Sequence, residues 1–198
     1  LEDLNPKKLQ ERLKILLSFY TKQKGEQVPV GKYKLVLGPA AIAEYLGFLS
    51  YCGSDGKTME LGSGIYTEDV VGRKVLSDKF TLFDDPNCYQ AFAQQTDAYG
   101  IKRSKKALYE KGVHKGFLWS QQAADEYGKE PSGIELNNIS LSMQGGDMDI
   151  SSLDELLKMP RDRDILYVPY LHYTGLVNPS EGLITGTTRF GALLLKKD

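Results

Sequence analysis

The side chains of this sequence that could do chemistry are two imidazoles, two thiols and a few scattered carboxylates. His114 and His172 lie far apart in the chain, and Cys52 and Cys88 form no CxxC pair. The cysteine spacing argues against a zinc ribbon and against a disulfide scaffold, so we expect both thiols to be small core residues. A metal site needs several ligands at suitable spacing, and none of these residues has such neighbours. We therefore expect no catalytic residue, no metal ligand and no cofactor, with His114 on a solvent-exposed face and His172 among sheet aromatics.

The acidic residues with a distinctive setting are few. Glu44 is the only acidic residue in the apolar stretch from residue 38 to residue 52. Asp84 and Asp85 are adjacent and could bind a metal, but no third ligand is placed by spacing, and DDPN favours a turn. Asp97 belongs to TDAYG, a second turn signal. These carboxylates are therefore predicted to shape the backbone or to line a surface.

A glycine-rich segment at residues 53–69 includes Gly62-Ser63-Gly64. It lacks the GxxxxGK[ST] spacing of a phosphate-binding loop, so we exclude a nucleotide site there. The composition predicts a crossing loop or a hairpin.

The element that must position Glu44 is a strand that runs directly into a helix. Residues 32–37 alternate in the period of a strand, and Gly38-Pro39 ends it. Pro39 suits the first position of a helix, because its missing N–H would be unpaired there anyway. Ile42, Leu46 and Leu49 then recur at helical spacing. This predicts a helix with a buried apolar face.

The first 29 residues are predicted to form an amphipathic helix and a linker. Asn5-Pro6 is typical of a helix start, and leucines follow at helical spacing. The helix is expected to dock on the domain or to connect to an upstream domain. Residues 30–198 are predicted to form one domain, and because Leu1 is not methionine we expect a longer parent protein.

Beyond residue 69 the pattern alternates short strands with short helices. Gly112 marks a hairpin, Ser120 and Gly128 bound one helix, and Ser152 caps another. Strands are predicted near residues 80–83, 107–110, 113–119, 138–143, 165–168, 170–173, 182–187 and 190–195. The predicted class is α+β, a mainly antiparallel sheet with several helices packed on it.

Composition and charge argue against two classes of partner, nucleic acid and membrane. The chain has 198 residues, 41% of them hydrophobic, and a net charge of -1. Such a charge gives no electrostatic reason to expect nucleic acid as a partner. No apolar run reaches the ~20 residues that span a bilayer, so we expect no membrane partner and a cytoplasmic location.

The order of short motifs resembles the C-terminal domain of the TldD/PmbA family, whose members have been called modulators of DNA gyrase and are regarded as peptidases. The resemblance covers roughly residues 30–198. The matching segments, in family order, are VLGPAAIAEYLGFLS, TLFDDPN, TDAYG, YEKGVHKGFLWS, EPSG, NNISLSMQGGDMDISSLDELL and GLVNPSEGLITGTTRFGALLLKKD. Each motif alone is short, and the colinear set carries the inference.

The resemblance implies a specific role. In the catalytic TldD-like members, the helix at this point carries an HExxxH zinc motif, whereas residues 38–52 here contain no histidine. The chain therefore resembles the TldE/PmbA type. This implies a non-catalytic subunit of an oligomeric peptidase complex, with a TldD-like paralogue carrying HExxxH as partner and unfolded or extended peptides as substrates in peptide maturation or turnover.

Two alternatives to this role stay open. The chain could be a metallopeptidase in its own right, or a stand-alone peptide-binding or assembly module. A homodimer could take the place of the complex with a paralogue. As a candidate groove or interface we take Glu44, Tyr45, Phe48, Asp84, Asp85, Asp97 and His172.

Overall fold

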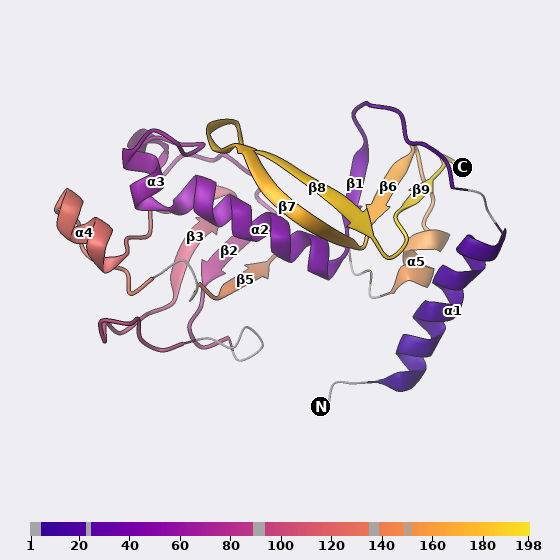
Figure 1. The fold of residues 1–198 in the computed structure, drawn as a ribbon, viewed down its shortest axis with the longest axis horizontal. Helices are drawn as coiled ribbons and strands as arrows, with labels where there is room; N and C mark the ends of the chain where they lie inside the picture. The colour runs from indigo at the N-terminus through magenta and orange to yellow at the C-terminus, as the bar shows by residue number, and fades with distance from the viewer. Residues whose placement is uncertain (1–4, 23–24, 89–93, 135–138, 149, 151) are drawn as a thin grey trace. The chain divides into compact units, whose positions relative to one another are not determined.

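The computed structural model describes residues 5–22, 25–88, 94–134, 139–148, 150 and 152–198 (Figure 1). The elements in chain order are α1 (Pro6–Lys22), β1 (Lys34–Leu37), α2 (Pro39–Ser54), α3 (Gly56–Glu60), η1 (Glu68–Val70), β2 (Thr81–Asp84), β3 (Lys106–Glu110), β4 (Val113–His114), α4 (Gln121–Tyr127), β5 (Leu141–Gln144), α5 (Leu153–Lys158), β6 (Ile165–Val168), β7 (Tyr170–Asn178), η3 (Pro179–Glu181), β8 (Leu183–Arg189) and β9 (Leu193–Leu195). The strands form three sheets, in the orders β1-β6-β9, β4-β3-β2-β5 and β7-β8. The predicted α+β class with antiparallel sheets is confirmed.

The chain divides into two compact units. One unit takes Leu1–Ile42, Met148–His172 and Thr187–Asp198, and the other takes Ala43–Asp147 and Tyr173–Gly186. None of the helices in the described part of the chain combines the length and apolar character that crossing a bilayer requires.

The first unit is built on the sheet β1-β6-β9. β1 pairs with β6 in parallel, and β6 pairs with β9 in the antiparallel direction. One core cluster joins α5 to this sheet, with buried Leu156, Ile165, Tyr167 and Leu195. Val36 packs against this cluster, whereas Leu35 is 55% exposed.

Gly38 is required where β1 ends. A Cβ at this position would lie 2.8 Å from the carbonyl oxygen of Pro169, which is closer than real Cβ contacts allow. The Gly38 N–H donates to the Val168 oxygen at 2.9 Å and so extends the β1–β6 ladder by one residue. The strand can therefore turn into α2 while it still lies against β6.

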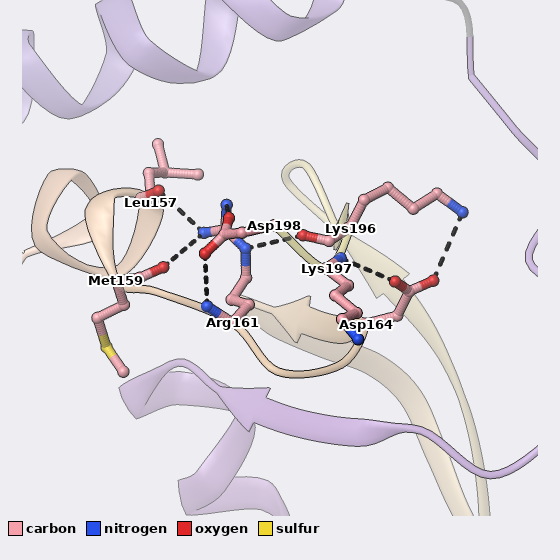
Figure 2. Close-up of polar contacts among 7 residues, drawn as sticks. All are labelled: Leu157, Met159, Arg161, Asp164, Lys196, Lys197 and Asp198. Carbon is pink, nitrogen blue, oxygen red and sulfur yellow. Dashed lines mark hydrogen bonds and ion pairs between the residues drawn. The ribbon is translucent and has the colours of Figure 1, made fainter.

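An arginine fastens the end of α5 to the last residues of the chain (Figure 2). The Arg161 guanidinium donates to the carbonyl oxygens of Leu157 and Met159, both at 3.0 Å, and to that of Lys196 at 2.9 Å. It also pairs with the Asp198 carboxylate at 2.8 Å. Arg161 thus satisfies carbonyl groups that a helix end leaves without partners.

α1 begins as predicted but exposes most of its apolar stripe. The Asn5 side chain accepts from the N–H groups of Lys7 and Lys8 at 3.1 and 3.2 Å, as a helix cap should. Contact with the rest of its unit is seen at its C-terminal half, where Leu16 and Tyr20 lie beside Gly191. The other leucines and the tyrosine stay outside the core, with exposed fractions of 56% for Leu9, 48% for Leu13, 58% for Leu17 and 66% for Tyr20.

The second unit is built on the antiparallel sheet β4-β3-β2-β5 (Figure 1). Lys111 and Gly112 both have positive φ, so the predicted β3–β4 turn is confirmed. Ser120 caps α4 through the Ala123 N–H at 3.2 Å, and Gly128 ends it in the left-handed region. A core cluster of Met59, Trp119, Ala123 and Ala124 joins α3 to α4.

Two predictions about local structure are wrong. Residues 53–69 are not one continuous loop, because Asp55 caps the short helix α3 by accepting from the Thr58 N–H at 2.7 Å. Only residues 61–67 are irregular, and η1 follows them. The last strand does not begin at Phe190, because Phe190 and Gly191 have positive φ and break the chain between β8 and β9. The predicted strand starting at residue 138 is seen as β5 from Leu141, and residues 135–138 lie outside the described ones.

Candidate functional site

Three of the predicted site residues, Glu44, Tyr45 and Phe48, lie on α2. Glu44 and Phe48 recur at helical spacing with Tyr51, which was not predicted, so Glu44, Phe48 and Tyr51 lie on one side of the helix. Together with Leu176 of β7 they line an open groove of about 520 Å³. We call it the α2 groove, and its lining is Ala43, Glu44, Gly47, Phe48, Tyr51 and Leu176. Tyr45 is 43% exposed on the same helix but does not line the groove.

The carboxylate of the α2 groove is held by β7. The Thr174 hydroxyl donates to Glu44 Oε2 at 2.9 Å. Both residues belong to the second unit, in which β7 runs beside α2 (Figure 1). Among the described residues that line the groove, Glu44 is the only charged one.

A second hollow opens where α2 meets α3. Its volume is about 350 Å³, within the range of ligand pockets. We call it the serine pocket, because its lining includes Ser50, Ser54, Ser63 and Ser120 beside Thr58. Leu61, Leu118, Ile134 and Ile139 give it apolar walls, and it shares Gly47 and Tyr51 with the α2 groove.

The sequence did not point to several of these residues. Ser50 and Tyr51 lie three and four positions after Gly47 on α2, and that helical spacing is a signal that could have found them. Thr174 and Leu176 are more than a hundred residues from Glu44, so only the fold brings them together.

Asp84 belongs to a buried ion pair and not to the α2 groove. Its Oδ1 lies 2.6 Å from Nη2 of Arg103, and both side chains are excluded from solvent. The same oxygen accepts from the Ser140 N–H at 2.8 Å. Asp84 therefore fixes β2 to two neighbouring segments. No local pattern in the sequence indicates Arg103 as its partner, because the two residues are 19 positions apart.

Asp85 and Asp97 shape turns, as their motifs predicted. Asp85 accepts from the Asn87 N–H at 3.0 Å, and Lys105 lies 2.9 Å from its other oxygen. The hydrogen bond from Lys105, followed by that from Asn87, lowers the pKa of Asp85. Asp97 Oδ1 accepts from the N–H groups of Tyr99 and Ile101 at 2.9 and 2.8 Å.

His172 lies in the first unit, on β7. Its ring is 6.2 Å from that of Tyr170, and its carbonyl oxygen accepts from the Thr187 hydroxyl at 3.0 Å. Of the seven predicted site residues, the structure thus brings Glu44 and Phe48 into one groove. Tyr45 is on the same helix, and Asp84, Asp85, Asp97 and His172 have other surroundings.

His114 is fully buried, so the prediction of a solvent-exposed histidine is wrong. Its Nε2 lies 2.8 Å from the Gly53 carbonyl oxygen, which can only accept, so Nε2 carries the hydrogen. Its Nδ1 accepts from the Gly116 N–H at 3.2 Å. Tyr66, Tyr109 and Phe117 surround the ring, with centroids 5.5, 5.2 and 4.8 Å away. Burial lowers the pKa of His114, and both ring nitrogens are already bonded.

The two thiols are not joined by a disulfide. Cys52 is buried on α2, and its burial raises the pKa of the thiol, which leaves it a poor nucleophile. Cys88 is half-buried after the DDPN turn. Among the residues that the structure describes, no group of three or more His, Cys, Asp and Glu side chains could hold a metal ion.

Comparison with known proteins gives a consistent family. Residues 30–197 match the model of the PmbA/TldA metallopeptidase C-terminal domain. The chain is 27% identical over 110 residues to a metalloprotease of Methanothermobacter thermautotrophicus, an alignment that covers 56% of this chain and 24% of the relative.

Solved structures show the same fold. TldE from Thermococcus kodakarensis is similar with a TM-score of 0.62 and 25% identity, over 85% of this chain and 40% of that one. A Thermotoga maritima protein described as a modulator of a DNA gyrase is similar with a TM-score of 0.67 and 20% identity, over 97% of this chain and 46% of that one. The chain thus spans less than half the length of these relatives.

The family description implies a metal, and the donor set of α2 does not fit one. Glu44 is its only acidic residue, it has no histidine, and the Glu44 carboxylate is bonded to Thr174. A zinc site takes three or four nitrogen, sulfur or oxygen ligands, and the described residues that line the α2 groove and the serine pocket include no such group of His, Cys, Asp and Glu side chains. The match over residues 30–197 nevertheless covers nearly the whole chain, and the chain belongs to the PmbA/TldA metallopeptidase C-terminal domain family.

Proposed function

We propose that this chain is a non-catalytic, TldE/PmbA-like subunit of a cytoplasmic peptidase complex. Its partner is a TldD-like paralogue that carries HExxxH, and the complex acts on unfolded or extended peptides. The observation that carries the proposal is the character of α2. The helix that resembles the zinc-bearing helix of the catalytic members displays Glu44, Phe48 and Tyr51 along a groove, without a metal-binding pair.

The fold supports a peptide as the ligand. β7 and β8 form a two-stranded sheet, and β7 contributes Leu176 to the α2 groove. Extended peptides commonly bind by adding a strand to a sheet edge, with side-chain pockets providing specificity. A strand edge next to a groove offers both parts of that mode of recognition.

Co-expression with a TldD-like paralogue tests the complex. We expect the two chains to elute together in size-exclusion chromatography, with zinc bound through the paralogue. Elution of this chain as a separate homodimer would contradict the proposal. So would about one zinc per chain in the chelator-free chain purified alone, which would support a metallopeptidase in its own right.

A further inference from the structure

Gly47 is a glycine that the packing of the described chain does not explain. It lies in the interior of α2, where glycine is among the poorest helix formers. A Cβ added at Gly47 would meet nothing within 4 Å among the described atoms. The other α2 glycine is different, because a Cβ at Gly53 would lie 2.5 Å from the Tyr109 hydroxyl. Fold packing therefore requires Gly53 and leaves Gly47 without a structural reason.

Gly47 lies where the two hollows meet. It lines both the α2 groove and the serine pocket, and Tyr51, one turn further along α2, also lines both. Because Gly47 has no side chain, no Cβ stands on the helix surface at position 47, and a Cβ added there would meet nothing within 4 Å among the described atoms. A ligand can therefore pass over α2 at this point and occupy both.

The lining of the two hollows favours an extended peptide. Phe48 and Leu176 on one side, and Ile134 and Leu118 on the other, provide separate apolar surfaces. In an extended peptide, side chains on the same face are about 7 Å apart, so alternate residues can enter neighbouring hollows. The backbone between them would cross the bare surface at Gly47.

Charge indicates which part of the peptide faces the α2 groove. Glu44 is the only charged side chain among the described residues of that lining, and its Oε2 is positioned by Thr174. An exposed carboxylate fixed in this way is complementary to a cation. The groove therefore favours a free N-terminal ammonium or a basic side chain over an acidic one.

We propose that Gly47 is the crossing point of one continuous peptide-binding groove, in which an extended peptide places alternate apolar side chains in the α2 groove and the serine pocket and a positive charge beside Glu44. This inference rests on the proposed peptide-binding function and adds the path and polarity of the ligand. It concerns this chain alone and needs no partner.

Fluorescence anisotropy with a short labelled peptide tests the groove. The probe alternates leucine and serine, has a free N-terminus and carries fluorescein at its C-terminus. We expect Gly47→Leu to weaken binding at least about tenfold, because leucine preserves the helix and fills the crossing point. Ala40→Leu is the matched control, since Ala40 is exposed on the same helix and lines neither hollow, and it should leave the affinity unchanged.

Two further measurements separate a ligand role from a structural one. Gly47→Ala should raise the melting temperature by about 2–4 °C, because alanine improves the helix and the space is open. A lower melting temperature would mean that packing requires glycine and would overturn the inference. Acetylation of the N-terminus of the probe should weaken its binding to the native chain but not to Glu44→Gln. If the carboxylate accepts any cation, an internal lysine in the acetylated probe should restore the lost affinity.

The outcomes also separate this inference from the proposed function. Equal peptide affinity of Gly47→Leu and the native chain, or no binding of the probe at all, would overturn the groove. If Gly47→Leu instead loses the TldD-like paralogue and keeps the peptide, α2 is a protein interface and the groove is again overturned. In each of these cases co-elution with the paralogue would still support the proposed function.

Discussion

The buried residues with polar side chains are the clearest features at the scale of single residues. His114 is enclosed by three aromatic rings and bonded through both nitrogens. A second proton on its ring would remove the acceptor for the Gly116 N–H and place a charge in an apolar setting. Asp84 and Arg103 neutralise each other in the core. Both features tie segments that are distant in sequence, and both have measurable consequences.

Because of His114, we expect the native protein to be less stable in mild acid than at neutral pH. The folded pKa of His114 is lowered by burial, whereas in the unfolded chain it is about 6.5, so the unfolded state binds more protons. The stabilising contribution of neutral His114 is complete above the unfolded pKa. As the pH falls from the unfolded pKa toward the folded pKa, the free energy of unfolding decreases by at most about 1.4 kcal/mol per pH unit. Urea unfolding at a series of pH values should show this slope reduced in His114→Gln.

His172→Gln is the matched control for this pH series, because it removes the other histidine of the chain. Comparison of the two series shows which imidazole is responsible for the slope. An unchanged slope in His114→Gln would show that His114 takes up its proton without cost and that the buried geometry is wrong.

Removing one partner of the Asp84–Arg103 pair should be strongly destabilising. Arg103→Met leaves a buried carboxylate without its cation, which costs about 3–5 kcal/mol in comparable cases. Lys79→Met removes the cation of the exposed Lys79–Asp147 pair and should cost less than about 1 kcal/mol. Denaturant unfolding measures the loss of unfolding free energy in both variants. If the two losses were similarly small, the Asp84–Arg103 pair would be exposed to solvent and not buried.

At the scale of elements, α2 connects the sheet of the first unit to the site. It begins at Pro39 after the β1–β6 ladder and carries Glu44, Gly47 and Tyr51 to the groove. Leu46 is 6% exposed, while Ile42 and Leu49 are half-buried. The helix thus packs mainly through one face, and its remaining surface can line the α2 groove and the serine pocket.

Truncation of Leu46 tests that packing. Leu46→Ala should cost about 2–5 kcal/mol of unfolding free energy, through lost transfer energy and the cavity left behind. Leu17→Ala, at a leucine of α1 that is 58% exposed, should stay within about 0.5 kcal/mol. A loss below about 1 kcal/mol for Leu46→Ala would mean that this face of α2 does not belong to the core.

Local signals explain which elements could be predicted. The Asn5 and Ser120 caps, the Gly112 turn and the Asp85 turn depend on a few neighbouring residues, and the sequence displays them. The parallel β1–β6 pair, the burial of His114 and the Arg103 partner of Asp84 depend on contacts made across long stretches of chain. Glu44 and Phe48 could be predicted together because they lie on one helix. Leu176 could not, because only the fold brings it to them.

At the scale of the whole molecule, the central question is which chain supplies the chemistry. Metal-assisted hydrolysis needs ligands for the ion and a base for the bound water. Glu44 could act as a base, but no metal-binding residue stands beside it on α2. Serine or cysteine chemistry needs an activating base near the nucleophile, and the His114 ring is bonded to backbone groups on both sides. These features motivate the proposal that this chain is a non-catalytic subunit and that a paralogue supplies the metal.

The most direct test measures hydrolysis of an unstructured peptide by this chain alone, by the TldD-like paralogue alone, and by the two together, with zinc present. We expect no cleavage by this chain alone, and we expect cleavage by the complex that a chelator abolishes. Mutation of the HExxxH glutamate in the paralogue should remove the activity, whereas Glu44→Gln should not. Cleavage by this chain alone, surviving the chelator and lost in His172→Ala, would contradict the account and identify the chain as an enzyme.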